Sequence, residues 1–468
     1  MNPLQPSPAV PADRRAVVIG ASIAGLLAAR VLSEHYAEVV LLERDRLPDF
    51  AAPRKGTPHA VHPHGLLARG REAIESLFPG FTDALVARGA LLGDIGTDIA
   101  VDANRARFAR RPAGVMAVAA SRLAIEAELR RRVRALPGVH LLDEVDVHAP
   151  LQAEGRVSGV SFHRRDAAAQ PETLAAALVL DCTGRGSRSP AWLRDWGYDT
   201  PPEDRVTVGL AYSSAYFRRD AGARPGMACV IGAATPEVPR PSILIAQEPD
   251  EQGQARWVAG VGGYAGDHVD TTLEAMRRRA AEIGNAEIEA LAAHGEAIGP
   301  VMRYLFPHSQ RRRYERLRRF PRGYLVMGDA LASFNPIYGQ GMTVAACEAL
   351  ALRDAMARGL RDLAPRFFKA AAKVIDVPWQ LAVGGDLALP SVVGPRPWPL
   401  KLINAYVGRV QRAAVTDPVV AQAFVRVMHL LAAPPSLFAP SVAWRVWRHR
   451  GAAVAVMPAS PAGQRVVT

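Results

Sequence analysis

The chain has 468 residues, of which 49% are hydrophobic and 6% aromatic, so it can form two or three domains with a sizeable core. Its net charge is +12, but only four of the 57 basic residues are lysines and no recognition motif accompanies the arginines, so we expect no nucleic-acid partner. Three scattered cysteines exclude a disulfide framework, and no apolar run reaches the about 18–20 residues of a membrane span, so we expect a cytoplasmic protein without a bound metal.

The first 200 residues alternate between predicted strands and helices. Residues 1–13 contain four prolines and are predicted to be a disordered tail. Residues 14–200 form the first part of an α/β domain, with strands expected at 16–19, 38–42, 139–147, 157–162 and 174–181, and helices at 23–33, 66–77 and from Ser121 onward. Ser121 is a candidate N-cap of the last of these helices.

Near residue 200 the pattern changes to strands without intervening helices. The β-rich segments are 205–217, 227–233, 242–247 and 256–264, and helical segments follow at 270–296. This pattern predicts an inserted domain with an antiparallel sheet at 201–300. The α/β pattern returns at 301–375, and residues 376–468 are predicted to form a helical C-terminal region punctuated by prolines.

A glycine-rich turn follows the first predicted strand, at Gly20-Ala-Ser-Ile-Ala-Gly25. Gly20 allows a tight turn, Gly25 lets the helix pack on the strand, and the helix N-terminus faces a pyrophosphate. Ser22 replaces the usual second glycine but is small enough for a phosphate to approach. Glu43, at the end of the second strand, is placed to accept from adenosine ribose hydroxyls, which favours FAD or NAD over NADP.

A second turn of this kind lies late in the chain and favours FAD over NAD. A short apolar strand ends at Gly328-Asp329, where a carboxylate can bind a ribitol chain. The loop 335–341 then leads into a helix expected at 342–356. A helix N-terminus carries about half a positive charge, which would stabilise the anionic edge of a reduced flavin.

These segments, together with Arg54-Lys-Gly56 and Asp181-Cys-Thr-Gly-Arg-Gly-Ser-Arg188, resemble the FAD-dependent monooxygenases of the para-hydroxybenzoate hydroxylase superfamily. Within it, the chain is most similar to the branch of polyene epoxidases of polyether biosynthesis. The resemblance covers about residues 14–380 and implies an α/β fold: a Rossmann-like FAD-binding domain of the para-hydroxybenzoate hydroxylase type, with the inserted antiparallel sheet as substrate domain and a helical C-terminal region.

The resemblance also implies which residues bind FAD. The pyrophosphate would lie at the first glycine turn, the AMP ribose at Glu43, the adenine at the backbone of Val147, and the ribityl chain at Asp329. Arg122 would contact the phosphate or ribityl region, although it can equally be a solvated helix arginine. The full set of implied FAD contacts is Gly20, Ser22, Ile23, Ala24, Gly25, Glu43, Arg44, Arg54, Lys55, Arg122, Val147, Gly184, Asp329, Pro336, Gly339, Gly341 and Met342.

One position departs from the family's pattern. The hydroxylases carry an Asp-Gly pair with a dual role near FAD and NADPH, and its Asp position is Thr183 here, before Gly184. The electron donor is therefore NAD(P)H, used either directly or through a separate flavin reductase. No nucleophile–base pair stands out, so no catalytic residue is assigned, and His62 and His64 are read as loop histidines rather than metal ligands.

The activity implied by the resemblance is monooxygenation with O2, in which a flavin C4a-hydroperoxide epoxidises or hydroxylates an apolar small molecule of secondary metabolism. An epoxide product is preferred from the resemblance alone. Candidate substrate contacts on the inserted sheet are Tyr212, Tyr216 and Phe217, of which only some can face inward because side chains alternate along a strand.

Other activities share the predicted fold. An alkene reductase or dehydrogenase of the geranylgeranyl reductase type is the main alternative. A flavin halogenase would need a catalytic lysine and a Trp-x-Trp-x-Ile-Pro segment, and the middle sheet has the lone Trp257. A non-catalytic flavin-binding scaffold is a further alternative that nothing in the sequence favours.

The basic C-terminal region permits one interpretation outside catalysis. Trp444 and Trp447 lie among arginines, and these residue types occur at lipid interfaces. Contact with a membrane surface or a partner protein is thus an alternative, but the sequence favours a helical cap over the catalytic domain.

Overall fold

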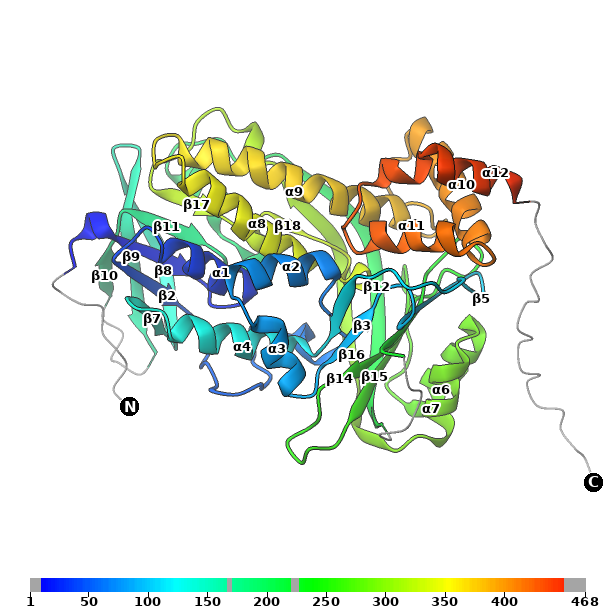
Figure 1. Cartoon of the computed structure of the whole chain (residues 1–468). Coiled ribbons are helices and arrows are strands. Elements are labelled where there is room, and N and C mark those ends of the chain that lie inside the picture. The colour runs from blue at the N-terminus through cyan, green and yellow to red at the C-terminus, as the bar shows by residue number, and fades with distance from the viewer. Residues whose placement is uncertain (1–9, 166–170, 220–226, 450–468) are drawn as a thin grey trace, which may run out of the picture.

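The computed structural model describes residues 10–165, 171–219 and 227–449, and it contains a five-stranded parallel sheet, at the left of Figure 1. The strand order is β17 (Tyr324–Val326), β11 (Leu178–Asp181), β1 (Arg15–Ile19), β2 (Glu38–Leu42) and β7 (Val139–Leu142). Every residue of β1 and β2 is buried, as expected for Val- and Leu-rich runs in a parallel sheet covered on both faces. The predicted strands at 16–19 and 38–42 are therefore confirmed. The single strand predicted at 174–181 is instead the end of β10 (Glu172–Ala175), which belongs to another sheet, followed by β11.

Helices and a second small sheet enclose this parallel sheet. The core contains residues of α1 (Ile23–Leu32), α4 (Arg122–Arg134) and α8 (Gly341–Met356). The predicted strand 139–147 is in fact β7 followed by β8 (Val145–Ala153), which pairs antiparallel with β9 (Arg156–Arg164) and through it with β10 (Glu172–Ala175). Further helices of this part are α2 (Ala68–Leu77), α3 (Phe81–Ala87) and α5 (Ser189–Asp195), and β3 (Leu91–Asp94) pairs with β6 (Met116–Ala119).

The inserted sheet has eight strands among the described residues. Its order is β18 (Ala332–Ser333), β16 (Ala297–Arg312), β12 (Glu203–Arg218), β15 (Arg256–Gly263), β14 (Ser242–Gln247), β13 (Cys229–Gly232), β4 (Ile99–Ala103) and β5 (Ala106–Arg107). Strands β12 to β15 match the four predicted segments. The pairs β12–β15, β14–β15 and β13–β14 are all antiparallel. On one face lie α6 (Leu273–Ile283) and α7 (Ala286–His294), which share a core with it.

Strand β16 was not predicted. It is 16 residues long and pairs with β12 along nearly its whole length. Gly299 and Pro307 interrupt its pattern, and its partner strand is remote in sequence, so neither propensity nor a hairpin turn marks it. The predicted boundary at 300/301 falls inside this strand, and the sheet takes strands from both predicted parts of the α/β domain.

The C-terminal region begins with a helix that crosses the predicted boundary at 376. Helix α9 (Leu363–Asp386) continues through Pro378 and packs on α8. It ends beside α10 (Trp398–Ala414), α11 (Pro418–Met428) and α12 (Pro440–Arg448) (Figure 1). These three helices share a second apolar core with residues of α2, β4 and β6, among them Ala68, Val101 and Ala117. Within the described residues, no helix combines the length and apolar character needed to cross a membrane.

The predicted N-terminal tail lies partly outside the described residues, which begin at residue 10. Ala12–Arg14 form a 3-10 turn directly before β1, so the described end of the predicted tail is ordered.

Candidate flavin site

The glycine turn between β1 and α1 requires glycine at both of its ends. Gly20 has φ of +98°, and a Cβ there would lie 2.7 Å from the carbonyl oxygen of Cys182. A Cβ on Gly25 would collide with the carbonyl oxygen of Gly20. The turn therefore brings the N-terminus of α1 close to the ends of two neighbouring strands, as a dinucleotide turn does.

Glu43 fixes this turn from the end of β2. Its carboxylate is buried and accepts hydrogen bonds from the backbone N–H of Ala21 at 2.9 Å and of Asp45 at 3.0 Å. Each carboxylate oxygen can accept more than one hydrogen bond, so these two contacts leave Glu43 able to accept from a ribose hydroxyl as well. The ribose contact itself stays a prediction.

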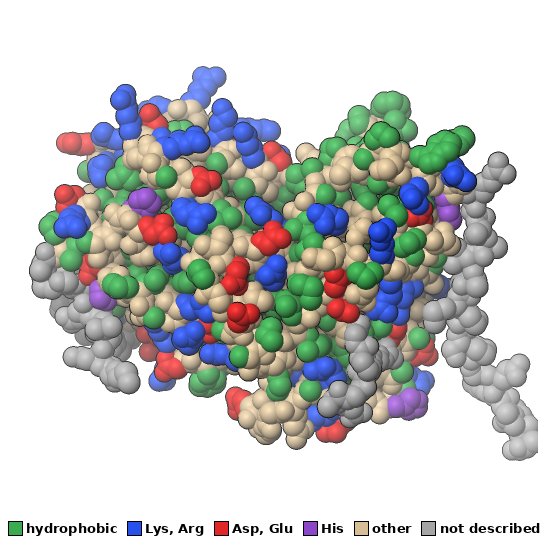
Figure 2. All heavy atoms as spheres, in the orientation of Figure 1, with side chains coloured by type: hydrophobic (Ala, Val, Ile, Leu, Met, Phe, Trp, Pro, Cys, Tyr) green, Lys and Arg blue, Asp and Glu red, His purple; other side chains and the backbone are tan. Residues whose placement is uncertain are grey.

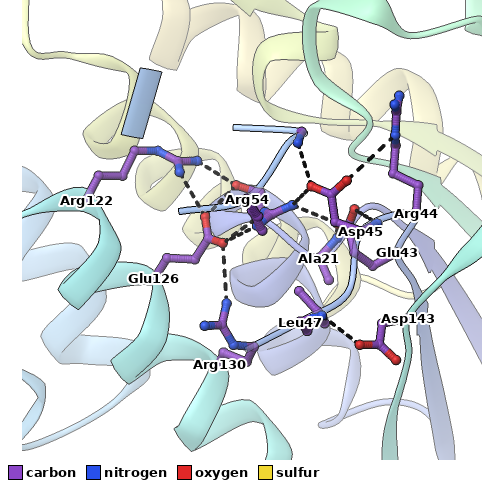
Figure 3. A network of polar contacts seen from close by, with 12 residues as sticks. Ala21, Glu43, Arg44, Asp45, Leu47, Arg54, Arg122, Glu126, Arg130 and Asp143 are labelled. Atoms are coloured by element: carbon purple, nitrogen blue, oxygen red, sulfur yellow. Dashed lines mark hydrogen bonds and ion pairs between the residues drawn. The ribbon is translucent and has the colours of Figure 1, made fainter. Parts of the chain in front are cut away.

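Beside the turn lies a buried network of arginines and carboxylates, centred on Glu126 of α4 (Figure 3). Arg54 and Arg122 pair with Glu126 at 2.9 and 3.0 Å, and Arg130 at 3.4 Å. Arg54 also pairs with Asp45 at 3.2 Å and with Glu43 at 3.4 Å. Burial disfavours the charged form of Glu126, but Arg122 and Arg54 outweigh this and hold its pKa below the usual range. The hydroxyl of Ser22 joins the network, donating to Glu126 at 3.0 Å and accepting from Arg122 at 2.7 Å.

The residues at this turn test whether it fits a diphosphate. Ser22 and Arg122 both border the cavity described below, and the hydrogen bond from Arg122 to Ser22 holds the guanidinium beside the N-terminus of α1. Guanidinium groups and helix N-termini both bind phosphate oxygens. The side chains beside the glycine turn therefore fit the pyrophosphate of FAD.

The late glycine motif lies across the same space. Gly328 has φ of +72° in a 3-10 turn with Asp329, and its N–H donates to the buried Glu348 at 2.7 Å. Asp329 is accessible from a cavity but lies deep in the protein, and this burial raises its pKa against the opposing effect of Arg185 and Arg122. A short turn at Pro336–Tyr338 and Gly339, with φ of +64°, then lead into α8.

All these parts meet at one cavity of about 2110 Å³. A single bound small molecule takes about 300–1,000 Å³, so the cavity has room for a cofactor and a substrate together. One wall comes from the two glycine motifs, with Ser22, Ile23, Ala24, Arg44, Arg122, Gly184, Asp329, Pro336, Gly339, Gly341 and Met342. The opposite wall is mainly apolar and comes from the inserted sheet and the C-terminal helices, with Ile231, Ile243, Ile245, Val261, Phe306, Leu381, Leu400, Val407, Phe424 and Leu437.

The remaining predicted FAD contacts do not border the cavity. Gly20, Gly25, Glu43 and Arg54 lie behind its wall and support the residues that do, whereas Lys55 and Val147 lie apart from it. The roles of all these residues in cofactor binding stay predictions.

Between the two walls lies a cluster of histidine and tyrosine rings. His62 packs edge-on against Tyr212 at 4.9 Å between ring centroids, and Tyr304 lies 5.6 Å from Tyr212 and 5.9 Å from His59. Burial lowers the pKa of His62 to about 4 and that of His64 to about 3. These rings are therefore neutral at neutral pH.

Of the three candidate substrate residues, the structure places one at the cavity. Tyr212 lines it. Phe217 lies on the other side of the sheet, buried in the core with Met276 of α6, and Tyr216 lies beneath the guanidinium of Arg256. A substrate contact for Tyr216 or Phe217 is not supported by this placement, because alternation along β12 turns Phe217 away and Tyr216 lies outside the residues that line the cavity.

Thr183 occupies the position where the hydroxylases carry aspartate, and its hydroxyl is engaged elsewhere. It donates to the buried carboxylate of Asp181 at 2.6 Å. Asp181 also accepts from the hydroxyls of Ser187 and Ser189. The carboxylate of this segment thus stabilises the turn after β11 and is not presented to the cavity.

Sequence reasoning missed several residues at the site. Glu126 was not singled out from the sequence, although it lies four residues from both Arg122 and Arg130, a spacing that places all three side chains on one face of a helix. Tyr304 and His59 meet only in the folded chain. A buried cluster behind the late loop was also missed: Oδ1 of Asp386 accepts from Asn335 at 2.8 Å and from the hydroxyls of Tyr264 and Tyr338 at 3.0 Å each.

No metal centre accompanies the cavity in the part of the chain that the structure describes, since no group of three or more His, Cys, Asp or Glu side chains there is arranged to hold an ion.

Comparison with solved structures identifies the fold. A flavoprotein/dehydrogenase from Cytophaga hutchinsonii matches with a TM-score of 0.62 and 16% identity, over 89% of this chain and 92% of that one. The p-nitrophenol 4-monooxygenase PnpA from Pseudomonas putida DLL-E4 matches with a TM-score of 0.61 and 16% identity, over 90% and 98%. PqsL, a probable FAD-dependent monooxygenase from Pseudomonas aeruginosa, matches with a TM-score of 0.57 and 17% identity, over 88% and 99%.

The chain therefore has the fold of FAD-binding monooxygenases, and the predicted fold class is confirmed. Protein Rv3254 of Mycobacterium tuberculosis is 37% identical over 440 residues, which are 89% of this chain and 89% of that protein. The chain belongs to the same family as Rv3254. No family model matches the chain. The similarity to the polyene epoxidase branch stays a prediction.

Proposed function

We propose that this protein is an FAD-dependent monooxygenase that transfers an oxygen atom from O2 to an apolar small molecule. One observation carries the proposal: a single cavity joins the two glycine motifs, with Arg122 and Asp329 beside them, to an apolar wall of the inserted sheet and the C-terminal helices. The fold shared with monooxygenases supports it. Epoxidation of a secondary metabolite is our preferred reaction, with hydroxylation as the related outcome.

In this proposal, FAD supplies the reaction with O2 once it is bound and reduced. Arg122 and Ser22 bind the pyrophosphate and Asp329 accepts from the ribityl hydroxyls. The N-terminus of α8 stabilises negative charge on the flavin ring, because its first N–H groups and its dipole point there. The neutral ring cluster of His59, His62, Tyr212 and Tyr304 excludes water and orients the substrate without adding charge.

The electron donor is NAD(P)H, directly or through a separate flavin reductase. The substitution of Thr183 for the family's aspartate, and its hydrogen bond to Asp181, support a departure from direct NADPH use. A small-molecule substrate and O2 are the partners required in either case.

The test begins with the visible spectrum of the purified protein, anaerobic titration with NADPH and NADH, and re-exposure to O2. We expect a yellow protein that a nicotinamide bleaches directly, or one bleached only by dithionite if a reductase is needed. Asp329→Ala should lose flavin while keeping its secondary structure, whereas Asp270→Ala should keep both, because Asp270 is exposed and does not line the cavity. A colourless protein that takes up no added FAD would refute the proposal.

The product identifies the reaction. With an apolar alkene and isotopically heavy O2, a monooxygenase incorporates one heavy oxygen atom. A product that gains two hydrogens and no oxygen would instead support the alkene reductase alternative.

A further inference from the structure

Helix α10 separates the cavity from solvent and has apolar side chains on both faces. Its inner face lines the cavity through Leu400, Asn404 and Val407. Its outer face carries Trp398 and Leu402, which are 72% and 53% exposed and do not line the cavity. The only buried residues of this 17-residue helix are Val410, Ala413 and Ala414, at its C-terminal end. Its first three turns therefore cover the cavity while their outer apolar face has no described residues packed over it.

Helix α12 extends the same kind of surface. Trp444 and Trp447 stack on each other with ring centroids 5.2 Å apart and are 55% and 66% exposed. The guanidinium of Arg448 lies over the Trp444 ring, 5.7 Å from its centroid. Figure 2 shows hydrophobic side chains gathered over α10 and α12, at the upper right of the view. We call Trp398, Leu402, Trp444 and Trp447 the outer apolar patch.

The charge around this patch has one sign. Between residues 387 and 449 the chain has seven lysine and arginine residues and a single acidic residue, Asp417. The carboxylate of Asp417 pairs with Arg445 at 2.9 Å. Arg409 on α10 and Arg448 on α12 thus add positive charge beside exposed tryptophans, without acidic neighbours in sequence. Lys401 is also exposed but lies at the edge of the cavity, which it lines.

We infer that the outer apolar patch docks on an anionic lipid bilayer. Tryptophan and leucine insert at the boundary between headgroups and acyl chains, and arginine and lysine pair with anionic headgroups. Each basic residue near such a surface adds to the attraction, which weakens as the salt concentration rises. A second copy of this chain fits less well, because the net charge of +12 and the local excess of basic residues repel an identical surface.

Docking would also bring the bilayer to the cover of the cavity. An apolar molecule dissolved in the membrane could then reach the apolar wall around α10 without crossing bulk water. This route rests on the proposed function, whereas the docking itself does not.

The test is co-sedimentation of the full chain with vesicles, with no flavin reduction involved. We expect the protein to sediment with vesicles of equal parts phosphatidylcholine and phosphatidylglycerol, less so at high salt, and weakly with phosphatidylcholine alone. Trp398→Ala with Leu402→Ala should lower the partition coefficient at least tenfold, because two exposed apolar side chains of this size leave the interface. Lys401→Gln with Arg409→Gln should lower it on anionic vesicles only.

The matched control is Phe50→Ser with Leu360→Ser, which removes two exposed apolar side chains outside the patch. It should partition as the unmodified protein does. Circular dichroism checks that each variant is folded. Partition unchanged in Trp398→Ala with Leu402→Ala, or no sedimentation with anionic vesicles, would overturn the docking, as would a dimer that this pair of substitutions dissociates. Loss of docking leaves the flavin spectrum unchanged, so failure of this inference is distinguishable from failure of the proposed function.

Discussion

Helices α4 and α10 border the same cavity but differ in how many of their residues are buried and in how their charges are paired. In α4, nine of thirteen residues are buried, and the buried Arg122 and Arg130 are paired with Glu126. In α10, three of seventeen residues are buried, and there is no acidic residue in the helix. We call the wall proposed to bind the cofactor the cofactor side, and the wall proposed to face the substrate the substrate side. The difference teaches that the cofactor side is held in a fixed geometry, because its buried charges are paired, whereas α10 on the substrate side has few buried residues that a substitution could disturb.

The largest predicted effect breaks the charge pairing on the cofactor side. Glu126→Gln leaves the guanidinium groups of Arg122 and Arg130 buried without the carboxylate they pair with, whereas Arg54 keeps its ion pairs with Asp45 and Glu43. We expect the free energy of unfolding to fall by about 3–5 kcal/mol, the usual cost of removing one partner of a buried ion pair. Urea unfolding of flavin-free protein at neutral pH measures it.

The control for this substitution is Glu274→Gln, which removes an exposed carboxylate that pairs with Arg277 and Arg278. It should change stability by no more than about 0.5 kcal/mol. Equal losses in the two variants would show that burial of the network contributes nothing.

A second prediction concerns the backbone on the same side. Gly25→Ala forces a Cβ against the carbonyl oxygen of Gly20, which cannot move without shifting β1. We expect a loss of about 3 kcal/mol in the free energy of unfolding and weaker flavin binding. Gly186→Ala should be close to neutral, because it meets no atom within 4 Å. A stable Gly25→Ala protein with full flavin occupancy would contradict the close approach.

A third prediction concerns how the stability of the protein depends on pH through the buried Asp386, which lies behind the late loop. Burial raises the pKa of Asp386 to about 7, against the hydrogen bonds from Asn335, Tyr338 and Tyr264. The folded state therefore holds a proton that the unfolded state, with a pKa of about 3.9, releases in this range, so this group's contribution to stability falls as pH rises.

Asp386→Asn removes that pH dependence while keeping an oxygen acceptor. The stability of the variant relative to the unmodified protein should rise by about 2 kcal/mol between about pH 5 and pH 7, and level off above. Thermal unfolding followed across this range measures the difference. Parallel profiles for the two proteins would mean that Asp386 titrates normally.

The smallest predicted effect is on the substrate side. Trp398→Ala with Leu402→Ala should change the free energy of unfolding by no more than about 0.5 kcal/mol, because both side chains are exposed. Urea unfolding in the absence of vesicles measures it. A loss of several kcal/mol would show that α10 is a structural element of the same kind as α4.

The same contrast explains what the sequence could predict. Strands β1, β2 and β11, the helix α1 and the late turn into α8 follow from apolar runs and from glycines whose positions the backbone demands. Strand β16 could not be predicted, because its polar residues, Gly299 and Pro307 break the alternating pattern of a strand. It is stabilised by pairing with β12, which is remote in sequence.

The site divides in the same manner. The glycine motifs and Asp329 were found from local spacing, and the structure places them around one cavity. The ring cluster of His59, Tyr212 and Tyr304 comes from three separate segments, so no local spacing could reveal it. Phe217 was proposed for its chemistry but faces the side of the sheet away from the cavity, because successive side chains of a strand point to opposite faces.

Glu126 has a consequence for the protein before it meets its cofactor. A cluster of buried guanidinium groups without a counterion would attract any small anion in the cell and would weaken the fold while it waited. Because Glu126 already neutralises part of that charge, the buried arginines are compensated from within the protein and need no anion from solution. The carboxylate thus acts as an internal counterion, and we expect it to keep the fold stable before any ligand binds.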